Sequence, residues 1–218
     1  TLGLLYADHF PYRQFASVRG VRRSPIHSYL KTEGACFGEI SGWERANWFL
    51  PKIEKDAGKK AKYNYSWRRQ NWFEYSAAEH MAVREKVGMF DMSSFGKIKL
   101  MGRDAEAVLQ LIAANDVAVP VGKIIYTQFL NSAGCIEADV TITRLGADEF
   151  LIVTPAATIR RDLHWINGHI PDDAHAIAVD ITVSEAVLAV MGPDARSFLE
   201  PLIPQSLENK DFPFATMQ

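Results

Sequence analysis

The sequence contains little cysteine, and its two cysteines, Cys36 and Cys135, are far apart. A disulfide framework in a chain of 218 residues would normally use more of them. Two isolated thiols cannot complete a tetrahedral zinc site without histidines at ligand spacing. The histidines are scattered, and the separation of His164 and His169 does not place them on one helix face. We therefore expect free thiols in a reducing compartment and no metal site.

The sequence also lacks a long hydrophobic run and an excess of charge of one sign. No stretch approaches the roughly 20 apolar residues of a membrane-spanning helix. The formal net charge of −2 gives no general attraction to nucleic acids or to membrane surfaces. The start of the chain shows no basic leader followed by an apolar segment. We expect neither a membrane nor a nucleic acid among the partners.

Common catalytic signatures are missing as well. There is no Gly-x-Gly-x-x-Gly and no Walker loop, so the chain shows no cradle for a nucleotide phosphate. There is no Gly-x-Ser-x-Gly nucleophile elbow either. Hydrophobic residues make up 48% and charged residues 23% of the chain, as in ordinary globular domains.

From residue 76 onward, helical and strand patterns alternate. Ser76 and Glu79 have the spacing of a capping box, which predicts a helix start there and a stop near Gly88. Asp104 and Asp194 each precede an amphipathic helix. The remaining predicted elements are strands over 97–101, 123–130, 136–145, 149–154, 176–181 and 186–191, and a helix around 159–166. This alternation predicts an α+β fold of antiparallel or mixed sheets with helices packed on one face.

The N-terminal part has a different composition. Residues 1–50 show few periodic runs and are expected to be irregular. Between Trp43 and Tyr75 basic and aromatic residues are interleaved, which is typical of single-stranded nucleic-acid platforms and also of a linker whose aromatic rings pack on a neighbouring domain. The slightly acidic chain favours the linker.

Two segments of the chain echo each other. Residues 100–105 (LMGRDA) recur as residues 190–195 (VMGPDA), and Leu109 and Leu199 keep the same offset. Each copy reads as a strand, a glycine turn, an aspartate cap and a helix. The similarity indicates either a duplication or the chance recurrence of a common unit.

A few polar residues are candidates for chemistry. Asn115 and Asp116 follow an apolar helix, where a carboxylate held by packing can face a cavity and accept a proton or orient an amine. The same residues are common at helix ends without any function. Asn131 begins a predicted hairpin turn and has the same ambiguity. Glu137 and Asp139 share one face of a strand and could pair, although such residues more often form a solvated edge.

Several ordered motifs resemble known families. The segments 90–97 (FDMSSFGK), 115–117 (NDV), 126–131 (YTQFLN), 134–139 (GCIEAD) and 190–193 (VMGP) resemble the aminomethyltransferases, the folate-binding proteins of the glycine cleavage T-protein type. The segments 22–27, 34–39 and 42–49 resemble the central segment of dimethylglycine and sarcosine dehydrogenases. In those flavoproteins an N-terminal flavin domain is joined through this segment to a folate-binding domain.

The resemblance implies a two-site enzyme. An FAD domain, which this chain does not contain, oxidises an N-methyl amine, and the folate domain captures the one-carbon unit on tetrahydrofolate as methylenetetrahydrofolate. Asp116 then corresponds to the carboxylate beside the reacting folate nitrogens, in a cavity closed to water. Asn131 corresponds to a pterin contact, Phe95 to an apolar residue packed on the folate, and Tyr126 to a weaker contact.

The resemblance also implies an organisation. Residues 1–70 would be the end of the flavoenzyme central segment with a linker, and residues 71–218 a folate-binding domain incomplete at its C-terminus. The partners would be an N-methyl amine and folate, and the location the bacterial cytoplasm or the mitochondrial matrix. The alternatives are a non-catalytic folate-binding or regulatory relative and a stand-alone aminomethyltransferase.

Overall fold

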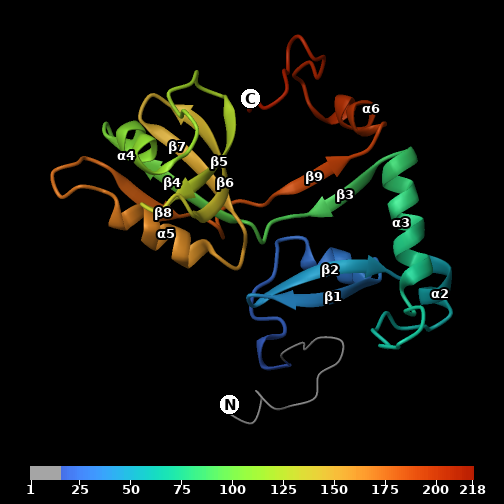
Figure 1. The fold of residues 1–218 in the computed structure, drawn as a ribbon. Helices are drawn as coiled ribbons and strands as arrows, with labels where there is room; N and C mark the ends of the chain where they lie inside the picture. The colour runs from blue at the N-terminus through green and yellow to red at the C-terminus, as the bar shows by residue number, and fades with distance from the viewer. Residues whose placement is uncertain (1–15) are drawn as a thin grey trace. The chain divides into compact units, whose positions relative to one another are not determined.

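The computed structural model describes residues 16–218, which form two compact units (Figure 1). The first unit comprises the chain up to Asp91 together with Leu188–Ala195. The second comprises Met92–Val187 and Arg196–Gln218. Each unit is described by itself. No helix among the described residues is long and apolar enough to span a membrane.

The second unit is built on one antiparallel sheet of five strands, in the order β5-β6-β7-β4-β8. Their bounds are β4 Gly96–Met101, β5 Ile124–Leu130, β6 Ile136–Gly146, β7 Glu149–Thr154 and β8 Ile177–Asp180. Buried and exposed residues alternate along β5 and β7, as expected for strands with one face on a core. The predicted strands are therefore confirmed to within a few residues at their ends.

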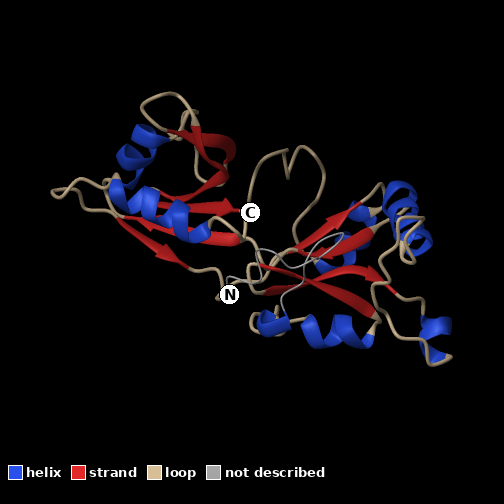
Figure 2. Ribbon diagram, turned by 60° about the horizontal axis from the view of Figure 1, so that its bottom comes forward, coloured by secondary structure: helices blue, strands red, loops and turns tan. Residues whose placement is uncertain are grey.

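Two helices pack on one face of this sheet, α4 (Ala105–Ile112) and α5 (Ile159–Gly168) (Figures 1 and 2). The apolar stripe of α4 is buried, and each such aliphatic side chain contributes about 1.5–3 kcal/mol to the free energy of folding. The core consists of this stripe, Ile159 and Ile166 of α5, and strand residues that include Ile98, Leu100, Phe129, Ile142, Phe150 and Ile152. The α+β class with helices on one face is thus confirmed.

The first unit contains a β-hairpin where the sequence predicted irregular structure. Strands β1 (Ala35–Ile40) and β2 (Trp43–Phe49) pair antiparallel around Ser41 and Gly42, both of which have positive φ. A turn with two positive φ values fits the twist of the flanking strands. The expectation of irregular structure before residue 50 was wrong because the two-residue turn at Ser41 and Gly42 pairs the segments on either side of it.

The remaining elements of the first unit are helices and a second strand pair. They are the 3-10 turn Ala16–Val18, α1 His27–Thr32, α2 Lys52–Asp56, α3 Phe73–Glu85, β3 Gly88–Asp91 and β9 Leu188–Met191. β3 and β9 pair antiparallel as a two-stranded sheet. The short helix α6 (Ala195–Leu199) and a 3-10 turn (Glu200–Leu202) follow β9, as the aspartate cap at 194 predicted.

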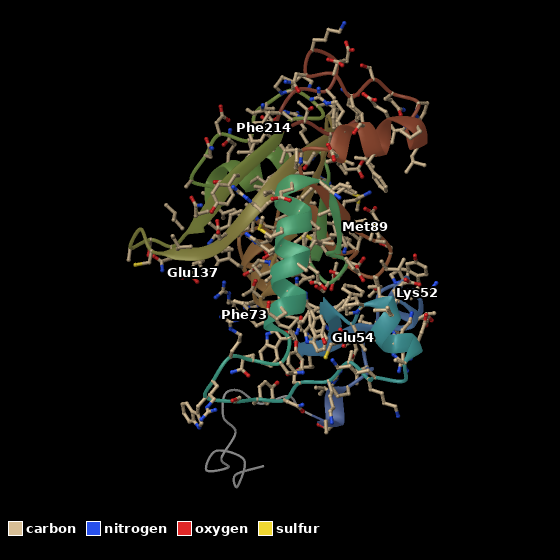
Figure 3. The ribbon with its side chains drawn as sticks, turned by 90° about the vertical axis from the view of Figure 1, so that its right-hand side faces the viewer. Lys52, Glu54, Phe73, Met89, Glu137 and Phe214 are labelled. Atoms are coloured by element: carbon tan, nitrogen blue, oxygen red, sulfur yellow. The ribbon has the colours of Figure 1, made fainter. Side chains whose placement is uncertain are left out.

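Helix α3 begins at Phe73, three residues before the predicted capping box (Figure 3). The amide of Ser76 donates to the carbonyl of Trp72 within the first turn, so Ser76 is not the cap. The Glu79 carboxylate instead accepts a hydrogen bond of 2.7 Å from the Phe49 amide in β2. Burial raises the pKa of Glu79. The predicted start at Ser76 was therefore wrong.

The basic and aromatic window forms a cluster of rings. Trp48 is 2% exposed and stacks on Tyr75, with ring centroids 5.3 Å apart. Tyr63 meets Trp48 and Trp72 edge-on, and Tyr65 stacks on Tyr63. These rings bury one another within the first unit, which accounts for much of the aromatic content of the window.

Candidate functional site

The loop after α4 is laid along the edge strand β5. The Ala114 amide donates to the carbonyl of Gln128 at 2.8 Å, and the Asn115 amide donates to Thr127 Oγ1 at 3.0 Å. The Asn115 side-chain amide reaches the carbonyl of Tyr126 at 3.4 Å. These bonds lay the loop that carries Asp116 along the strand that carries Tyr126.

The Asp116 carboxylate is held by one of its two oxygens. Oδ1 accepts a hydrogen bond of 2.6 Å from Gln110 Nε2 and one of 2.8 Å from the Ala118 amide. Among the described residues, no donor contacts Oδ2. The hydrogen bonds from Ala118 and then Gln110 lower the pKa of Asp116, so the group is ionised at neutral pH.

Asp116 is exposed, which corrects the expectation of a cavity closed to water. The reason is local, because the turn satisfies Oδ1 with its own amide and a helix side chain rather than by packing over the group. An ionised carboxylate with a lowered pKa is a weak base. It is better suited to stabilise positive charge than to remove a proton.

Tyr126 lies on the sheet face opposite the helices and is 63% exposed. Its hydroxyl donates to Asp139 Oδ2 at 2.9 Å, and Gln128 Nε2 donates to Asp139 Oδ1 at 3.0 Å. The hydrogen bond to Asp139 raises the pKa of Tyr126, which keeps the phenol protonated. The sequence left two alternatives for Asp139, a carboxylate pair with Glu137 or a place on a solvated edge. The structure pairs it with Tyr126 instead.

Asn131 organises the turn between β5 and β6. Its Oδ1 accepts hydrogen bonds of 3.0 Å from the amides of Ala133 and Cys135, and its Nδ2 donates to Glu137 Oε1 at 2.8 Å. Gly134 takes the positive φ that the turn requires. The side chain therefore has a structural task, with one Nδ2 hydrogen left for a further contact.

A cavity of about 410 Å³ lies beside this turn. Its wall is formed by the end of α4 and the first residues of the following loop, together with the end of β5. His169 contributes a polar group: its Nδ1 donates to the carbonyl of Trp165 at 2.8 Å, which leaves Nε2 as an acceptor in the neutral ring. The complete lining is Leu111, Ile112, Ala113, Ala114, Leu130, Asn131, Ser132 and His169.

Phe95 is half-buried in the loop before β4, away from the other predicted residues. Its carbonyl accepts a hydrogen bond of 3.0 Å from Nζ of Lys97, which is 1% exposed and also bonds the carbonyl of Ser93. The sheet register aligns Lys97 with Tyr126 across three strand spacings, or about 14 Å. Sequence analysis missed the burial of Lys97 because a lysine in an alternating strand normally faces solvent.

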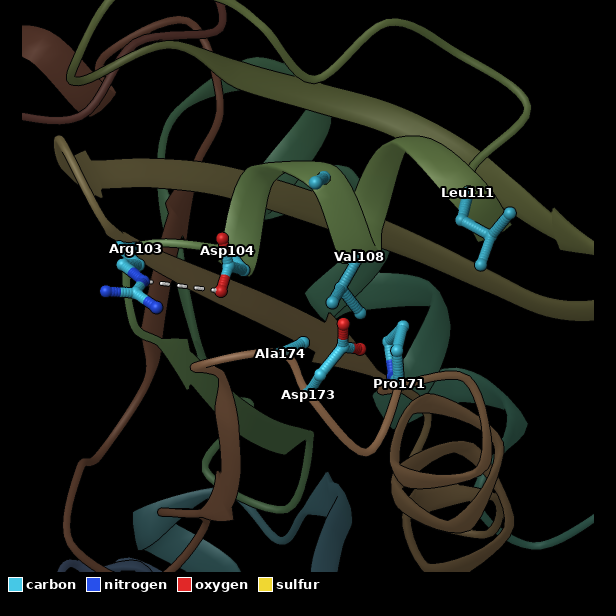
Figure 4. Close-up of a pocket in the computed structure, with 8 residues that line it drawn as sticks. Arg103, Asp104, Val108, Leu111, Pro171, Asp173 and Ala174 are labelled. Carbon is cyan, nitrogen blue, oxygen red and sulfur yellow. Dashed lines mark ion pairs between the residues drawn. The ribbon is translucent and has the colours of Figure 1, made fainter.

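A second cavity, of about 380 Å³, lies between α4 and the loop before β8 and contains none of the predicted site residues (Figure 4). At one end Arg103 pairs with Asp104 at 3.6 Å, and Leu111 lies at the other. Asp104 also accepts a hydrogen bond of 2.7 Å from the His175 amide. The sequence predicted that the Asp104 side chain caps α4. Its carboxylate instead bonds the loop before β8 and makes no side-chain capping bond to the helix.

Comparison with known families decides what the chain is related to. The family model of the GCVT N-terminal domain matches residues 26–218. The chain belongs to this family. The match includes the β1–β2 hairpin, the aromatic cluster and the whole of the second unit, so the resemblance read from the sequence motifs is confirmed.

Three relatives show where GCVT N-terminal domains like this one occur. The chain is 44% identical over 94% of its length to a 4-methylaminobutanoate oxidase (formaldehyde-forming) of Paenarthrobacter nicotinovorans. It is 30% identical over 97% of its length to human mitochondrial sarcosine dehydrogenase. It is 32% identical over 96% to the mouse mitochondrial pyruvate dehydrogenase phosphatase regulatory subunit. It covers 24%, 27% and 24% of these proteins, so it spans about a quarter of their length.

A solved structure confirms the fold of the GCVT N-terminal domain in this chain. The glycine cleavage system aminomethyltransferase T of Bartonella henselae superposes with a TM-score of 0.67 at 21% identity. The match covers 84% of this chain and 44% of that one.

Proposed function

We propose that this chain forms part of a tetrahydrofolate site in an FAD-dependent N-methyl amine dehydrogenase or oxidase, where the one-carbon unit is captured as methylenetetrahydrofolate. The observation that carries the proposal is the exposed Asp116 carboxylate, which is fixed through Oδ1 and free of donors from the described residues at Oδ2. The relatives that are named as an oxidase and a dehydrogenase of N-methyl amines support it.

The residues fit a reduced folate by their chemistry. Tetrahydrofolate supplies the amine nucleophile that attacks an oxidised N-methyl carbon. Asp116 Oδ2 stabilises the positive charge on the reacting nitrogens, because a fixed anion needs no reorganisation as that charge develops. The Tyr126 ring, fixed by its bond to Asp139, offers an apolar face to an aromatic ring system. Asn131 contributes its remaining Nδ2 hydrogen, and Phe95 an apolar contact.

We assign FAD to the part of the enzyme that this chain does not contain, because the sequence has no phosphate cradle. We propose residues 1–70 as the end of the flavoenzyme central segment and residues 71–218 as the folate-binding part. The small-molecule partners are an N-methyl amine and folate, without nucleic acid or membrane. The proposed location is the bacterial cytoplasm or the mitochondrial matrix.

A second candidate function is a scaffold that leaves the one-carbon unit uncaptured. The exposure of Asp116 favours it, because water would reach a reactive iminium there and release formaldehyde. The names of two relatives, a formaldehyde-forming oxidase and a regulatory subunit, point the same way.

One experiment separates the two candidates. The protein is supplied with an N-methyl amine, such as 4-methylaminobutanoate or sarcosine, with and without tetrahydrofolate. Formaldehyde and methylenetetrahydrofolate are measured for each amine oxidised. Folate capture predicts that methylenetetrahydrofolate appears at the expense of formaldehyde. An unchanged formaldehyde yield at saturating tetrahydrofolate would reject it in favour of the second candidate.

A further inference from the structure

Gln110 lies in the last turn of α4, and its side chain reaches the turn that carries Asp116. Its position on the exposed side of the helix means that it does not contribute to the core. An exposed glutamine on a helix normally extends into solvent, whereas this one makes two bonds to a single turn.

The two bonds use both ends of the side-chain amide. Nε2 donates to Asp116 Oδ1 at 2.6 Å, and Oε1 accepts from the Val117 amide at 3.4 Å. Val117 is fully buried, so the peptide group that bonds Gln110 Oε1 belongs to a residue anchored in the core. The carboxylate is therefore tied to the helix on one side and to its own turn, through the Ala118 amide, on the other.

We propose that Gln110 is the positioning residue of Asp116, keeping Oδ1 engaged so that Oδ2 is presented to the cationic centre of the reaction. This inference rests on the proposed function. Gln110 suits the task because its amide is neutral. A lysine at this position would neutralise the carboxylate, and a glutamate would repel it.

The surroundings of Asp116 make the role measurable. The hydrogen bonds from the Ala118 amide and then from Gln110 lower its pKa, burial opposes them, and no charged side chain of the described residues contributes. Removing or reversing the Gln110 bond therefore changes the titration of Asp116 without a competing ion pair. As the pH falls through that pKa, the carboxylate is protonated and capture of the one-carbon unit is lost.

The test compares Gln110→Leu and Gln110→Glu in the protein that carries the amine-oxidising activity. The measured quantity is the fraction of oxidised one-carbon units recovered as methylenetetrahydrofolate, followed from pH 8 down to the lowest pH at which the protein stays folded and oxidises the amine. We expect the acidic midpoint of capture to rise in Gln110→Leu, and to rise further in Gln110→Glu, where two carboxylates share one site. Amine oxidation stays unchanged.

Ala107→Glu is the matched control, because it adds the same charge one helical turn earlier and has no contact with Asp116. It should shift the midpoint by much less than Gln110→Glu. If Gln110 had only a structural role, both variants would lose stability, but the pH midpoint of capture would be the same in both as in the wild type. Equal midpoints in the wild type and both variants would therefore overturn the inference.

The failure of this inference can be told from the failure of the proposed function. If Asp116→Asn abolishes capture while the Gln110 variants keep the wild-type midpoint, the positioning role is rejected and the proposed function stands. If Asp116→Asn leaves capture unchanged, the role of Asp116 is rejected and the positioning role with it. If the unaltered protein itself captures nothing at saturating tetrahydrofolate, the proposed function fails.

Discussion

Gly102 lies so close to the carbonyl oxygen of His175 that a Cβ atom on it would overlap that oxygen. Gly192 has the same relationship to the carbonyl of Lys86, and the two glycines have φ values of 127° and 126°. In both places the aspartate two residues later donates its amide to that carbonyl, at 3.3 Å for Asp104 and 3.0 Å for Asp194. The sequence echo is therefore also a structural repeat.

The repeat extends to the neighbouring elements of each unit. β4 pairs antiparallel with β8, and β9 pairs antiparallel with β3. Helix α5 precedes β8 as α3 precedes β3, and a hairpin precedes each helix. The pairing is shared but the chain order differs, because β4 precedes α5 and β8 whereas β9 follows α3 and β3.

Replacing Gly102 with alanine should destabilise the second unit. The substitution combines a backbone conformation that alanine avoids with an overlap against a main-chain oxygen, which cannot move away as a side chain could. We expect a loss of about 2–4 kcal/mol in the free energy of unfolding by denaturant titration. Gly168→Ala is the control, because a Cβ there meets nothing within 4 Å and φ is not positive. An equal loss in both variants would contradict this account.

The sequence predicted the regular elements of the second unit well because their signals are local. The alternation of apolar and polar residues predicted strands β5 and β7, and a stripe of apolar residues at helical spacing predicted helix α4. The start of α3 was missed because Glu79 bonds the Phe49 amide, 30 residues away, instead of its own helix end. A long-range partner of this kind leaves no mark in a local pattern.

The Arg144 side chain should also contribute to the free energy of unfolding of the second unit. Its Nη1 pairs with Glu106 at 2.6 Å and bonds the Val119 carbonyl, while the rest of the guanidinium bonds the carbonyls of Gly146 and Ala147. We expect Arg144→Ala to lower the free energy of unfolding by about 2–3 kcal/mol. Arg144→Lys should restore little, because an ammonium group cannot reach all these acceptors.

The comparison with Glu106→Gln isolates the ion pair. That partner is partly exposed, so we expect a cost below about 1 kcal/mol from the same denaturant titration. A loss in Glu106→Gln as large as that in Arg144→Ala would show that the charge pair, rather than the carbonyl contacts, carries the effect.

The first unit should lose stability in acid through Glu44. Its hydrogen bonds with Arg19, at 2.7 and 2.9 Å, and then with the Gly20 amide lower its pKa, against an opposing effect of burial. A carboxyl group whose folded pKa is depressed contributes stability above its unfolded pKa and loses it as the pH falls. We expect this loss below about pH 4.3, the ordinary glutamate value.

Glu44→Gln should flatten the stability curve in that range and enlarge a change at higher pH, because the Glu44 charge partly offsets the lowering of the His27 pKa. Burial, followed by the charge of Arg23, lowers the pKa of His27. Stability linked to His27 is therefore full above its unfolded pKa of about 6.5 and falls on acidification from there. Thermal unfolding at a series of pH values measures both. An unaltered curve below pH 4.3 in Glu44→Gln would contradict the prediction.

The candidate site was predictable only in part. The resemblance pointed to Asp116 and Tyr126, and the structure joins the loop of Asp116 to the strand of Tyr126 through Asn115. The exposure of Asp116 and its hydrogen bond from Gln110 were not predictable. A bond from the end of a helix to the turn that follows it has no characteristic sequence spacing. The pairing of Asp139 with Tyr126 depends on strand register, which the sequence alone does not fix.

The most direct test of the account is the product balance of Asp116→Asn. The substitution removes the charge but keeps the shape, and Asp172→Asn, at an exposed position, is the matched control. With a saturating N-methyl amine and tetrahydrofolate, the account predicts unchanged amine oxidation and a fall of about tenfold or more in methylenetetrahydrofolate, with formaldehyde released in its place. A methylenetetrahydrofolate yield equal to that of the wild type would contradict it.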